Sequence, residues 1–250
     1  MSSSGLSRVV GEPPLNLHTM DATLLDAVRS GDRRALSRAI SQVEQDGVPT
    51  GLPAPGSVIG ITGPPGAGKS TLISALIEMM RSRGESVSVL AVDPSSPVTG
   101  GAILGDRIRM QGHIDDEGVY IRSMATRGHL GGLAPATGEA VALLDAAGFD
   151  RVVVETVGVG QSEVEVMGLA AVVVLVVGPS WGDQIQADKA GIVEIADVFV
   201  VNKGDRPGVN DVERALREAA DTKDVKVLVT TATTGEGVAD LLAEIDRLLV

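Results

Sequence analysis

Two short motifs, far apart in the chain, carry the residue types best suited to chemistry. The first runs from Gly63 to Ser70 and combines three glycines with a lysine and a hydroxyl group. Glycines at this spacing let successive backbone N–H groups point at phosphate oxygens, while Lys69 would reach the β- and γ-phosphates and the Ser70 hydroxyl would bind Mg²⁺. The residues expected to contact the ligand from this phosphate loop are Gly63, Pro64, Pro65, Gly66, Ala67, Gly68, Lys69, Ser70 and Thr71.

The second motif, Asn202–Asp205, reads Asn-Lys-Gly-Asp and contains the groups needed to recognise guanine. The Asp205 carboxylate can accept hydrogen bonds from the guanine N1–H and exocyclic amine, which adenine cannot supply, and losing such a buried pair costs about 1–3 kcal/mol. Asn202 would tie loops together and touch N7, while the stem of Lys203 would cover the base face. A backbone N–H from Thr231–Ala232 would meet guanine O6. Together the two motifs predict a protein that binds GTP and GDP.

Three carboxylates and one further glycine are candidates for the catalytic centre beside Lys69. Glu155 ends an apolar strand, where an acid can hold Mg²⁺ directly or through water, and Gly158 would bring its N–H to the γ-phosphate. Asp93 would bind a metal water or orient the attacking water, and Asp106 would be a second carboxylate near Mg²⁺. The alternatives are a solvated strand end for Glu155 and helix caps for the two aspartates. Because no glutamine directly follows Gly158, we expect slow hydrolysis that depends on a partner.

The elements that must position these residues alternate between strand and helix. Strands are predicted over Val58–Thr62, Val87–Val92, Val119–Arg122, Arg151–Thr156, Ala171–Val177, Val198–Asn202 and Lys226–Thr230. Helices are predicted over Lys69–Arg83, Ala136–Ala147, Ile185–Ile195, Asp211–Ala220 and Val238–Leu249. This alternation predicts an α/β fold of the P-loop NTPase kind, with a mostly parallel central sheet and helices on both faces. Each motif follows a predicted strand, and ligands of such sheets bind beyond the carboxyl ends of the strands.

The chain divides into three predicted regions. Residues 1–20 are rich in Ser, Gly and Pro and read as a flexible lead-in. Residues 21–50 carry apolar residues at helical spacing, interrupted at Gly31, and Asp32 is a suitable N-cap for the second of two short helices. Residues 51–250 form the nucleotide-binding domain.

The composition excludes several classes of partner. A formal net charge of −12 argues against nucleic acid and against anionic membranes. The chain has no Cys, which removes disulfides and thiol catalysis and fits a reducing compartment. Its longest apolar run, Leu169–Val177, is too short for a membrane-spanning helix, which needs about 20 residues. We therefore expect a cytoplasmic protein that binds neither nucleic acid nor membrane.

The chain resembles the MeaB/ArgK family of GTPases, which belongs to the SIMIBI class of P-loop GTPases. Members of this family are G-protein chaperones of adenosylcobalamin-dependent acyl-CoA mutases of the methylmalonyl-CoA mutase type. The resemblance covers Ala22 to the C-terminus and rests on four stretches: Gly31–Leu36, Gly63–Ser70, Asp93–Asp106 and Glu155–Glu163. It implies the same roles for the phosphate-loop residues and the three carboxylates as those given above.

The resemblance also implies a mobile loop through which the mutase influences hydrolysis. Its residues here include Gly178, Trp181, Asp183 and Lys189. Trp181 departs from the small residues expected there, so it is either an interface anchor in an exposed loop or a locally packed side chain. Family members usually continue into a helical arm that makes the dimer, whereas this sequence stops at Val250. A homodimer through the nucleotide face, a different oligomer and a truncated piece are the alternatives.

Three functions follow from these observations. The first is a GTPase chaperone that couples hydrolysis to cofactor loading and protection of a B12-dependent mutase. The second is a metal-insertion GTPase of the UreG or HypB type, which needs Cys and His ligands, whereas this chain has no Cys and only His18, His113 and His129. The third is a GTP-dependent binding module whose slow turnover is incidental.

Overall fold

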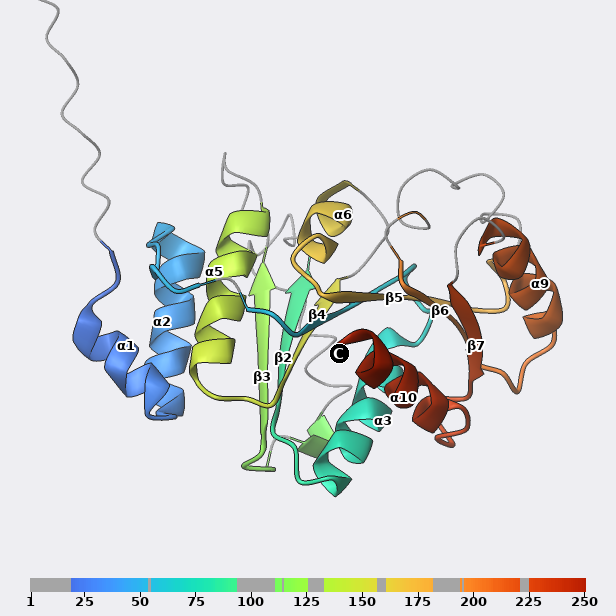
Figure 1. The fold of residues 1–250 in the computed structure, drawn as a ribbon, viewed down its shortest axis with the longest axis horizontal. Helices are drawn as coiled ribbons and strands as arrows, with labels where there is room; N and C mark the ends of the chain where they lie inside the picture. Colours follow the sequence, from blue (N-terminus) through green and yellow to red (C-terminus); the bar gives the residue numbers. More distant parts are fainter. Residues whose placement is uncertain are drawn as a thin grey trace, which may run out of the picture.

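Seven parallel strands form one sheet in the order β3-β2-β4-β1-β5-β6-β7 (Figure 1). The computed structural model describes residues 19–53, 55–93, 111–113, 115–125, 133–156, 161–181, 194, 196–220 and 225–250. The strands are β1 (Val58–Thr62), β2 (Val87–Asp93), β3 (Val119–Ala125), β4 (Arg151–Thr156), β5 (Val172–Val177), β6 (Val198–Asn202) and β7 (Lys226–Thr230). Every neighbouring pair in this order is parallel, which confirms the predicted α/β fold.

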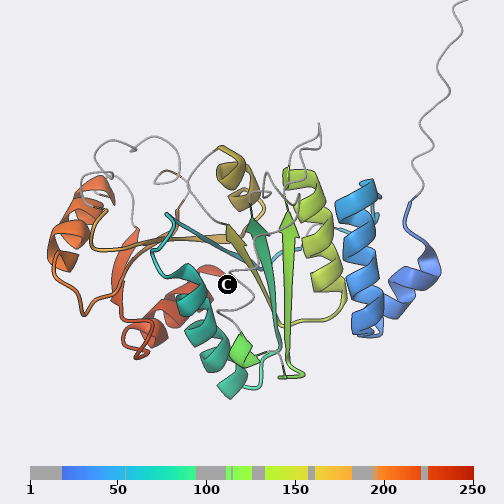
Figure 2. The same cartoon turned by 180° about the vertical axis from the view of Figure 1, so that it is seen from behind.

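Helices cover both faces of the sheet, as the two opposite views show (Figures 1 and 2). On one face lie α3 (Lys69–Ser82) and α10 (Val238–Leu248), which contact each other. On the other lie α5 (Leu133–Ala146) and α6 (Gln161–Met167), and α9 (Val209–Ala220) contributes to the same hydrophobic layer near β6 and β7. Each face therefore has its own apolar cluster, separated by the sheet.

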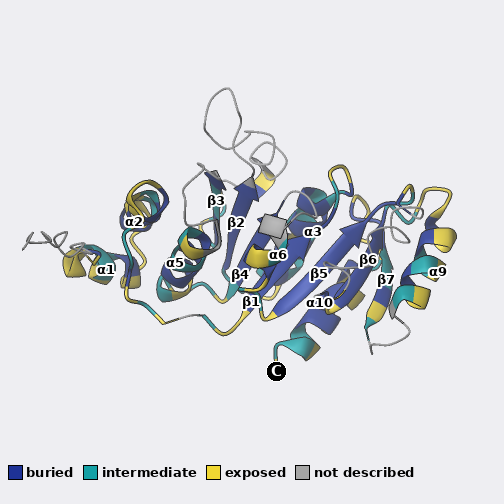
Figure 3. Ribbon diagram, turned by 90° about the horizontal axis from the view of Figure 1, so that it is seen from above, coloured by how far each residue is buried: buried dark blue, intermediate teal, exposed yellow. Residues whose placement is uncertain are grey.

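The central strands are buried on both sides (Figure 3). Every residue of β1, β5 and β6 is buried, and β5 reads Val-Val-Val-Leu-Val-Val. Branched side chains of this kind pack well on the pleated surface of a sheet that is covered on both faces. Successive residues face opposite layers, so Ile59 and Ile61 join the cluster under α3 while Val58 joins the cluster under α5.

Two N-terminal helices, α1 (Ala22–Arg29) and α2 (Arg33–Asp46), lie beyond α5 next to the β3 edge of the sheet. The Asp32 side chain accepts hydrogen bonds from the first backbone N–H groups of α2, which confirms the predicted N-cap. In the described part of the chain, no helix is long and apolar enough to cross a membrane.

The element boundaries differ from the predicted ones mainly at the starts of two helices and at the end of β3, which runs to Ala125 instead of the predicted Arg122. The predicted helix over 136–147 begins at Leu133, and the one over 211–220 begins at Val209, directly after Gly208. The helix α6 was not predicted, because seven residues are too few for a periodic apolar pattern to stand out. The predicted helix over 185–195 falls outside the described residues, apart from the helical Glu194.

Candidate functional site

The phosphate loop leaves the carboxyl end of β1 and ends where α3 begins. Three of its glycines have backbone angles that other residues rarely adopt, with φ of 142° at Gly63, 77° at Gly66 and 94° at Gly68. Two of them also lack room for a side chain. A Cβ on Gly63 would lie 1.9 Å from the carbonyl oxygen of Val176, and one on Gly68 would lie 2.4 Å from Nδ2 of Asn202. The loop therefore needs glycine both for its backbone shape and for its contacts with β5 and Asn202.

The Lys69 ammonium group is held inside this loop. The residue is 5% exposed, and Nζ donates to the carbonyl oxygens of Gly63 at 2.8 Å and Pro64 at 3.2 Å. Lys69 is also the first residue of α3, whose N-terminal end carries a partial positive charge. The ammonium and the helix end together favour an anion such as phosphate at this point.

Ser70 and Glu155 form a buried polar pair beside the phosphate loop. The Ser70 hydroxyl donates to Glu155 Oε1 at 2.9 Å, and the two residues are 3% and 1% exposed. Glu155 therefore is not a solvated strand end, because β4 delivers it next to the first turn of α3. Hydroxyl and carboxylate oxygens are the ligands that Mg²⁺ prefers.

The structure describes few of the remaining residues that were predicted to bind metal, to act in catalysis or to form the partner loop. Residue 93 ends β2 at the carboxyl edge of the sheet, where Val92 pairs with Thr156, but its side chain lies outside the described residues. Asp106, Gly158, Asp183 and Lys189 also lie outside them. Within the described ranges, no group of three or more His, Asp or Glu side chains is placed to hold a metal ion. The Ser70–Glu155 pair is thus the described part of the predicted Mg²⁺ site.

Asn202 joins the second motif directly to the phosphate loop. Its Nδ2 donates to the carbonyl oxygen of Ala67 at 3.0 Å, and its Oδ1 accepts from Thr230 Oγ1 at 3.1 Å and from the Ala232 N–H at 3.2 Å. The side chain is buried, with 2% of the residue exposed. The end of β6, the end of β7 and the phosphate loop therefore meet at one amide group.

The next three residues, Lys203, Gly204 and Asp205, form the turn that follows β6. Lys203 has a φ of 64°, a left-handed conformation found at no other non-glycine residue of the described ranges, and its Nζ donates to Gly66 O at 2.7 Å. Gly204 is needed because a Cβ there would lie 2.9 Å from Val229 Cγ1. Asp205 follows and is exposed, so its carboxylate is accessible to a ligand. Strained backbone at such a point is common where a loop is shaped for binding.

The contact of Thr231–Ala232 with guanine O6 stays a prediction, and both residues follow β7 directly. The Thr231 N–H donates to Glu236 O at 2.9 Å, and the Ala232 N–H donates to Asn202 Oδ1. Both amides are thus already engaged within the protein. The sequence could not show which groups accept these two hydrogen bonds, because this depends on how the loop after β7 folds and on its contact with the end of β6.

Trp181 is packed locally rather than exposed. The residue is 5% exposed and belongs to the hydrophobic cluster on the α5 side of the sheet, together with Val177 and Val209. Its backbone N–H donates to Gly178 O at 3.2 Å, and a Cβ on Gly178 would lie 4.0 Å from the Cα of Ala67. Of the two alternatives, the structure therefore shows the locally packed side chain, since burying a large aromatic surface in an apolar layer is favourable.

Sequence reasoning assigned no role to two threonines at the same edge. Thr62 directly precedes the phosphate loop and Thr156 directly follows Glu155, and their hydroxyls are 2.9 Å apart. Thr230, which bonds Asn202, was likewise given no role. The sequence feature that could have identified these threonines is a hydroxyl residue at the end of an otherwise apolar strand. Taken together, the site can hold phosphate at one end and present a carboxylate at the other.

Comparison with known proteins agrees with this arrangement. The family model described as "Methylmalonyl Co-A mutase-associated GTPase MeaB" matches residues 36–249. A protein of Pyrococcus horikoshii named as a GTPase is 50% identical over 239 residues, which span 89% of this chain and 75% of that protein. GTPase ArgK of Escherichia coli is 38% identical over 246 residues, 88% of this chain and 74% of its own length. The "Methylmalonic aciduria type A homolog, mitochondrial" of Mus musculus is 40% identical over 193 residues, 73% of this chain and 46% of its length.

Solved structures show the same architecture. A crystal structure of an LAO/AO transport system kinase superposes with a TM-score of 0.65 at 28% identity, covering 91% of this chain and 74% of the other. The hydrogenase maturation factor HypB of Archaeoglobus fulgidus superposes with a TM-score of 0.60, covering 91% of this chain and 100% of the other. Its identity is 18%, so that likeness shows the fold alone.

Proposed function

The chain belongs to the MeaB family of methylmalonyl-CoA mutase-associated GTPases, and on this premise we propose that it hydrolyses GTP while acting as chaperone to a B12-dependent acyl-CoA mutase. In this role, hydrolysis of GTP to GDP and phosphate couples to the loading of adenosylcobalamin onto the mutase and to protection of the loaded enzyme. The family description and the name of the mouse relative support the partner class.

One observation carries the nucleotide part of the proposal. The base-reading motif is hydrogen-bonded to the phosphate loop at two places, through Asn202 to Ala67 O at 3.0 Å and through Lys203 to Gly66 O at 2.7 Å. Motifs on opposite sides of the molecule could not share a ligand, whereas these two are in direct contact. A nucleoside triphosphate bound across both motifs would meet Lys69 at its phosphates and Asp205 at its base.

The described residues also fit the chemistry of hydrolysis. Water attacks the γ-phosphorus, the bond to the β–γ bridging oxygen breaks, and negative charge spreads over the phosphate oxygens. Lys69 and the N-terminal end of α3 place positive charge against these oxygens. Asp93 is proposed to orient the attacking water or a metal-bound water.

Mg²⁺ fits the oxygen donors at this edge of the sheet. The buried Ser70–Glu155 pair offers a hydroxyl and a carboxylate, and Asp93 and Asp106 are proposed to complete the site. When bound, Mg²⁺ neutralises charge on the β- and γ-phosphate oxygens. We expect Ser70 to contact the ion and Glu155 to act through a bound water.

A titration of the purified protein with nucleotides tests the first half of the proposal. We expect calorimetry in the presence of Mg²⁺ to show tight binding of GTP and GDP and weak binding of ATP, with slow release of phosphate from GTP. A preference for ATP would contradict the base assignment.

The chaperone half needs the partner. Single-turnover GTP hydrolysis and cofactor transfer are measured with and without an acyl-CoA mutase of the methylmalonyl-CoA mutase type. We expect the mutase to accelerate hydrolysis and the bound nucleotide to alter cofactor transfer. If the mutase leaves hydrolysis unchanged and transfer is the same with GTP and GDP, the protein is not a chaperone of that mutase, and a GTP-dependent binding module becomes the better account.

Metal insertion is not favoured by any described feature. The HypB likeness shows the fold alone, and the chain has no Cys among its 250 residues to serve as a nickel ligand.

A further inference from the structure

Two buried threonines link the phosphate loop to the strand that carries Glu155. Thr156 Oγ1 donates to Thr62 Oγ1 at 2.9 Å, and the two residues are 1% and 0% exposed. Thr62 directly precedes Gly63, and Thr156 directly follows Glu155. This contact, the threonine bridge, thus joins the ends of β1 and β4 where the site begins.

The threonine bridge lies in a row of residues that are in register across the seven strands, and its two residues differ in polarity from the others. Ile61 is in register with Glu155, so Thr62 and Thr156 are neighbours across β1 and β4. The same row continues on the five other strands with apolar residues that belong to the cluster under α5 and α6: Met124, Val92, Leu175, Phe199 and Val227. Two hydroxyls therefore lie in the middle of an otherwise apolar row.

The net stability that the hydrogen bond between these two hydroxyls adds is small. A buried hydrogen bond contributes little net free energy, because both groups must first lose their water, and replacing both partners by apolar groups of the same shape is nearly neutral or stabilising. Valine has nearly the shape of threonine and fills the rest of β4 between Arg151 and Glu155. A pair of valines would thus satisfy the packing.

The position of the bridge indicates what it holds. Successive strand residues face opposite sides of the sheet, so Glu155 contacts Ser70 on the α3 side while Thr156 contacts Thr62 on the α5 side. The end of β4 is therefore tied to the phosphate-loop region from both faces, at 2.9 Å in each case. Gly158 follows two residues later, within about 7 Å of chain length.

We propose that the threonine bridge is a positioning device for GTP hydrolysis. It holds the end of β4 at a fixed distance from the phosphate loop. The Gly158 N–H, which the sequence predicts to contact the γ-phosphate, follows two residues later. The inference rests on the proposed GTPase function, and Thr62 and Thr156 act through other groups rather than on the substrate. Because GDP lacks the γ-phosphate, the bridge matters for GTP and not for GDP.

The test compares a double variant, Thr62→Val with Thr156→Val, with the wild-type protein. We expect it to melt close to the wild-type temperature and to bind GDP normally, since the packing and Asn202 are unchanged. Its kcat for GTP should fall about ten- to a hundredfold, the range expected when a reacting group is misplaced by an ångström or less. Its affinity for a non-hydrolysable GTP analogue should fall relative to its affinity for GDP.

Two further variants sharpen this result. Thr156→Ser keeps the hydroxyl and should keep the wild-type kcat. Ser88→Ala removes a different buried hydroxyl, which bonds Arg151 O at 3.3 Å near the opposite end of the same sheet, and should leave both kcat and the affinity ratio unchanged. If the double valine variant does not fold, the single variant Thr156→Val is tested instead, and its affinity for the GTP analogue is compared with its affinity for GDP.

The outcomes separate the inference from the function on which it rests. A folded double variant with wild-type kcat and a wild-type ratio of analogue to GDP affinity overturns the bridge. So does an equal loss of both affinities, which would show that the bridge merely maintains the loop. A wild-type protein that hydrolyses no GTP, with or without mutase, contradicts the proposed function. In that case the ratio of the affinities for the GTP analogue and for GDP still shows whether the threonine bridge positions the end of β4.

Discussion

At the scale of single residues, the site depends on side chains that bind other parts of the protein as much as on those that face a ligand. The Asn202 side chain makes four hydrogen bonds to two separate segments, the phosphate loop and residues 230–232. Lys203 adopts a left-handed backbone conformation, and its side chain donates to Gly66. These contacts are made within the protein, so the two motifs are held together before a nucleotide binds. Preformed geometry lowers the entropic cost of binding.

Base selection is proposed to depend on Asp205. Replacing it in Asp205→Asn removes an acceptor for the guanine N1–H and amine, and supplies an amide donor that suits the second carbonyl of xanthine. We expect GTP affinity to fall by about 1–3 kcal/mol and xanthosine triphosphate to bind better. Calorimetric titration of the two nucleotides measures this. The control is Asp211→Asn, which changes another exposed aspartate a few residues later. Unchanged GTP affinity in the Asp205 variant would contradict the base-reading role of Asp205.

At the scale of elements, the N-terminal helices protect an edge of the sheet. β3 is the last strand on its side, and an uncovered edge invites pairing with another chain. Arg33 of α2 donates to Val119 O at 2.9 Å and also to Glu117 O, while Arg122 of β3 donates to Ser41 Oγ at 2.9 Å and to Glu44. The helix is therefore held along the strand by contacts at both of its ends.

Removing these contacts should expose the edge. We expect the double variant Arg33→Ala with Arg122→Ala to lose about 1–3 kcal/mol of unfolding free energy, because partly buried charge-assisted hydrogen bonds are lost. Light scattering should also show self-association through β3. Arg34→Ala, an exposed position in the same helical turn as Arg33, serves as the control. A double variant that is as stable and as monomeric as the control would show that α2 does not protect the edge.

The contact between α10 and β7 depends on a buried carboxylate. Hydrogen bonds from Arg247 and Lys226 lower the pKa of Glu244 from 4.5 to about 2, against the opposing effect of its burial. Because the folded-state pKa lies below the ordinary one, the ionised group stabilises the protein above pH 4.5. This stabilisation is lost as the pH falls from 4.5 towards 2.

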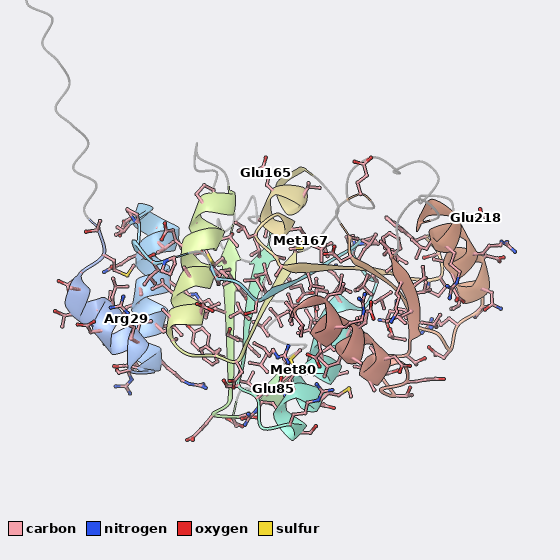
Figure 4. All side chains as sticks on the ribbon, in the orientation of Figure 1. Arg29, Met80, Glu85, Glu165, Met167 and Glu218 are labelled. Carbon is pink, nitrogen blue, oxygen red and sulfur yellow. The ribbon has the colours of Figure 1, made fainter. Side chains whose placement is uncertain are left out.

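Glu244→Gln should therefore lower the unfolding free energy at pH 7 by about 1–3 kcal/mol, with a smaller difference from wild type at pH 3. Urea denaturation at the two pH values measures this. Glu218→Gln, at an exposed position on α9 that lies away from the sheet in Figure 4, is the control. An equal loss at both pH values would show that the carboxylate does not act through its charge.

At the scale of the whole molecule, the site is assembled at one edge of the sheet from the ends of β1, β4, β6 and β7. A nucleotide that contacts all four would stabilise the folded state as a unit. At a concentration one hundred times the dissociation constant, a ligand adds about 2.7 kcal/mol of unfolding free energy. For a chain of this size, this corresponds to a rise in melting temperature of about 5–10 °C.

A thermal melt with different nucleotides checks this expectation. GTP and GDP with Mg²⁺ should each raise the melting temperature, and ATP at the same concentration should not. The fluorescence of Trp181, the single tryptophan of the chain and a buried one, reports the unfolding of the core. Equal stabilisation by ATP would show that the base does not contribute to recognition.

The sequence by itself determined the strands and the two motifs, because both are local properties. A short run rich in β-branched residues, such as Val172–Val177, favours a strand buried on both faces. The backbone angles of the phosphate loop are open mainly to glycine. The strand ends at β1, β4, β6 and β7 were therefore predicted without error. The family resemblance rested on four short stretches, Gly31–Leu36, Gly63–Ser70, Asp93–Asp106 and Glu155–Glu163.

The tertiary structure decided which of these segments meet. The strand order puts β4 next to β1, and only this order makes Glu155 a partner of Ser70 and Thr156 a partner of Thr62. The same holds for the burial of Trp181 and for the acceptors of the Thr231 and Ala232 amides. Pairings between residues 28 to 135 positions apart, as for Asn202 with Thr230 and Ala67, leave no periodic trace in the sequence, because they depend on how whole elements pack.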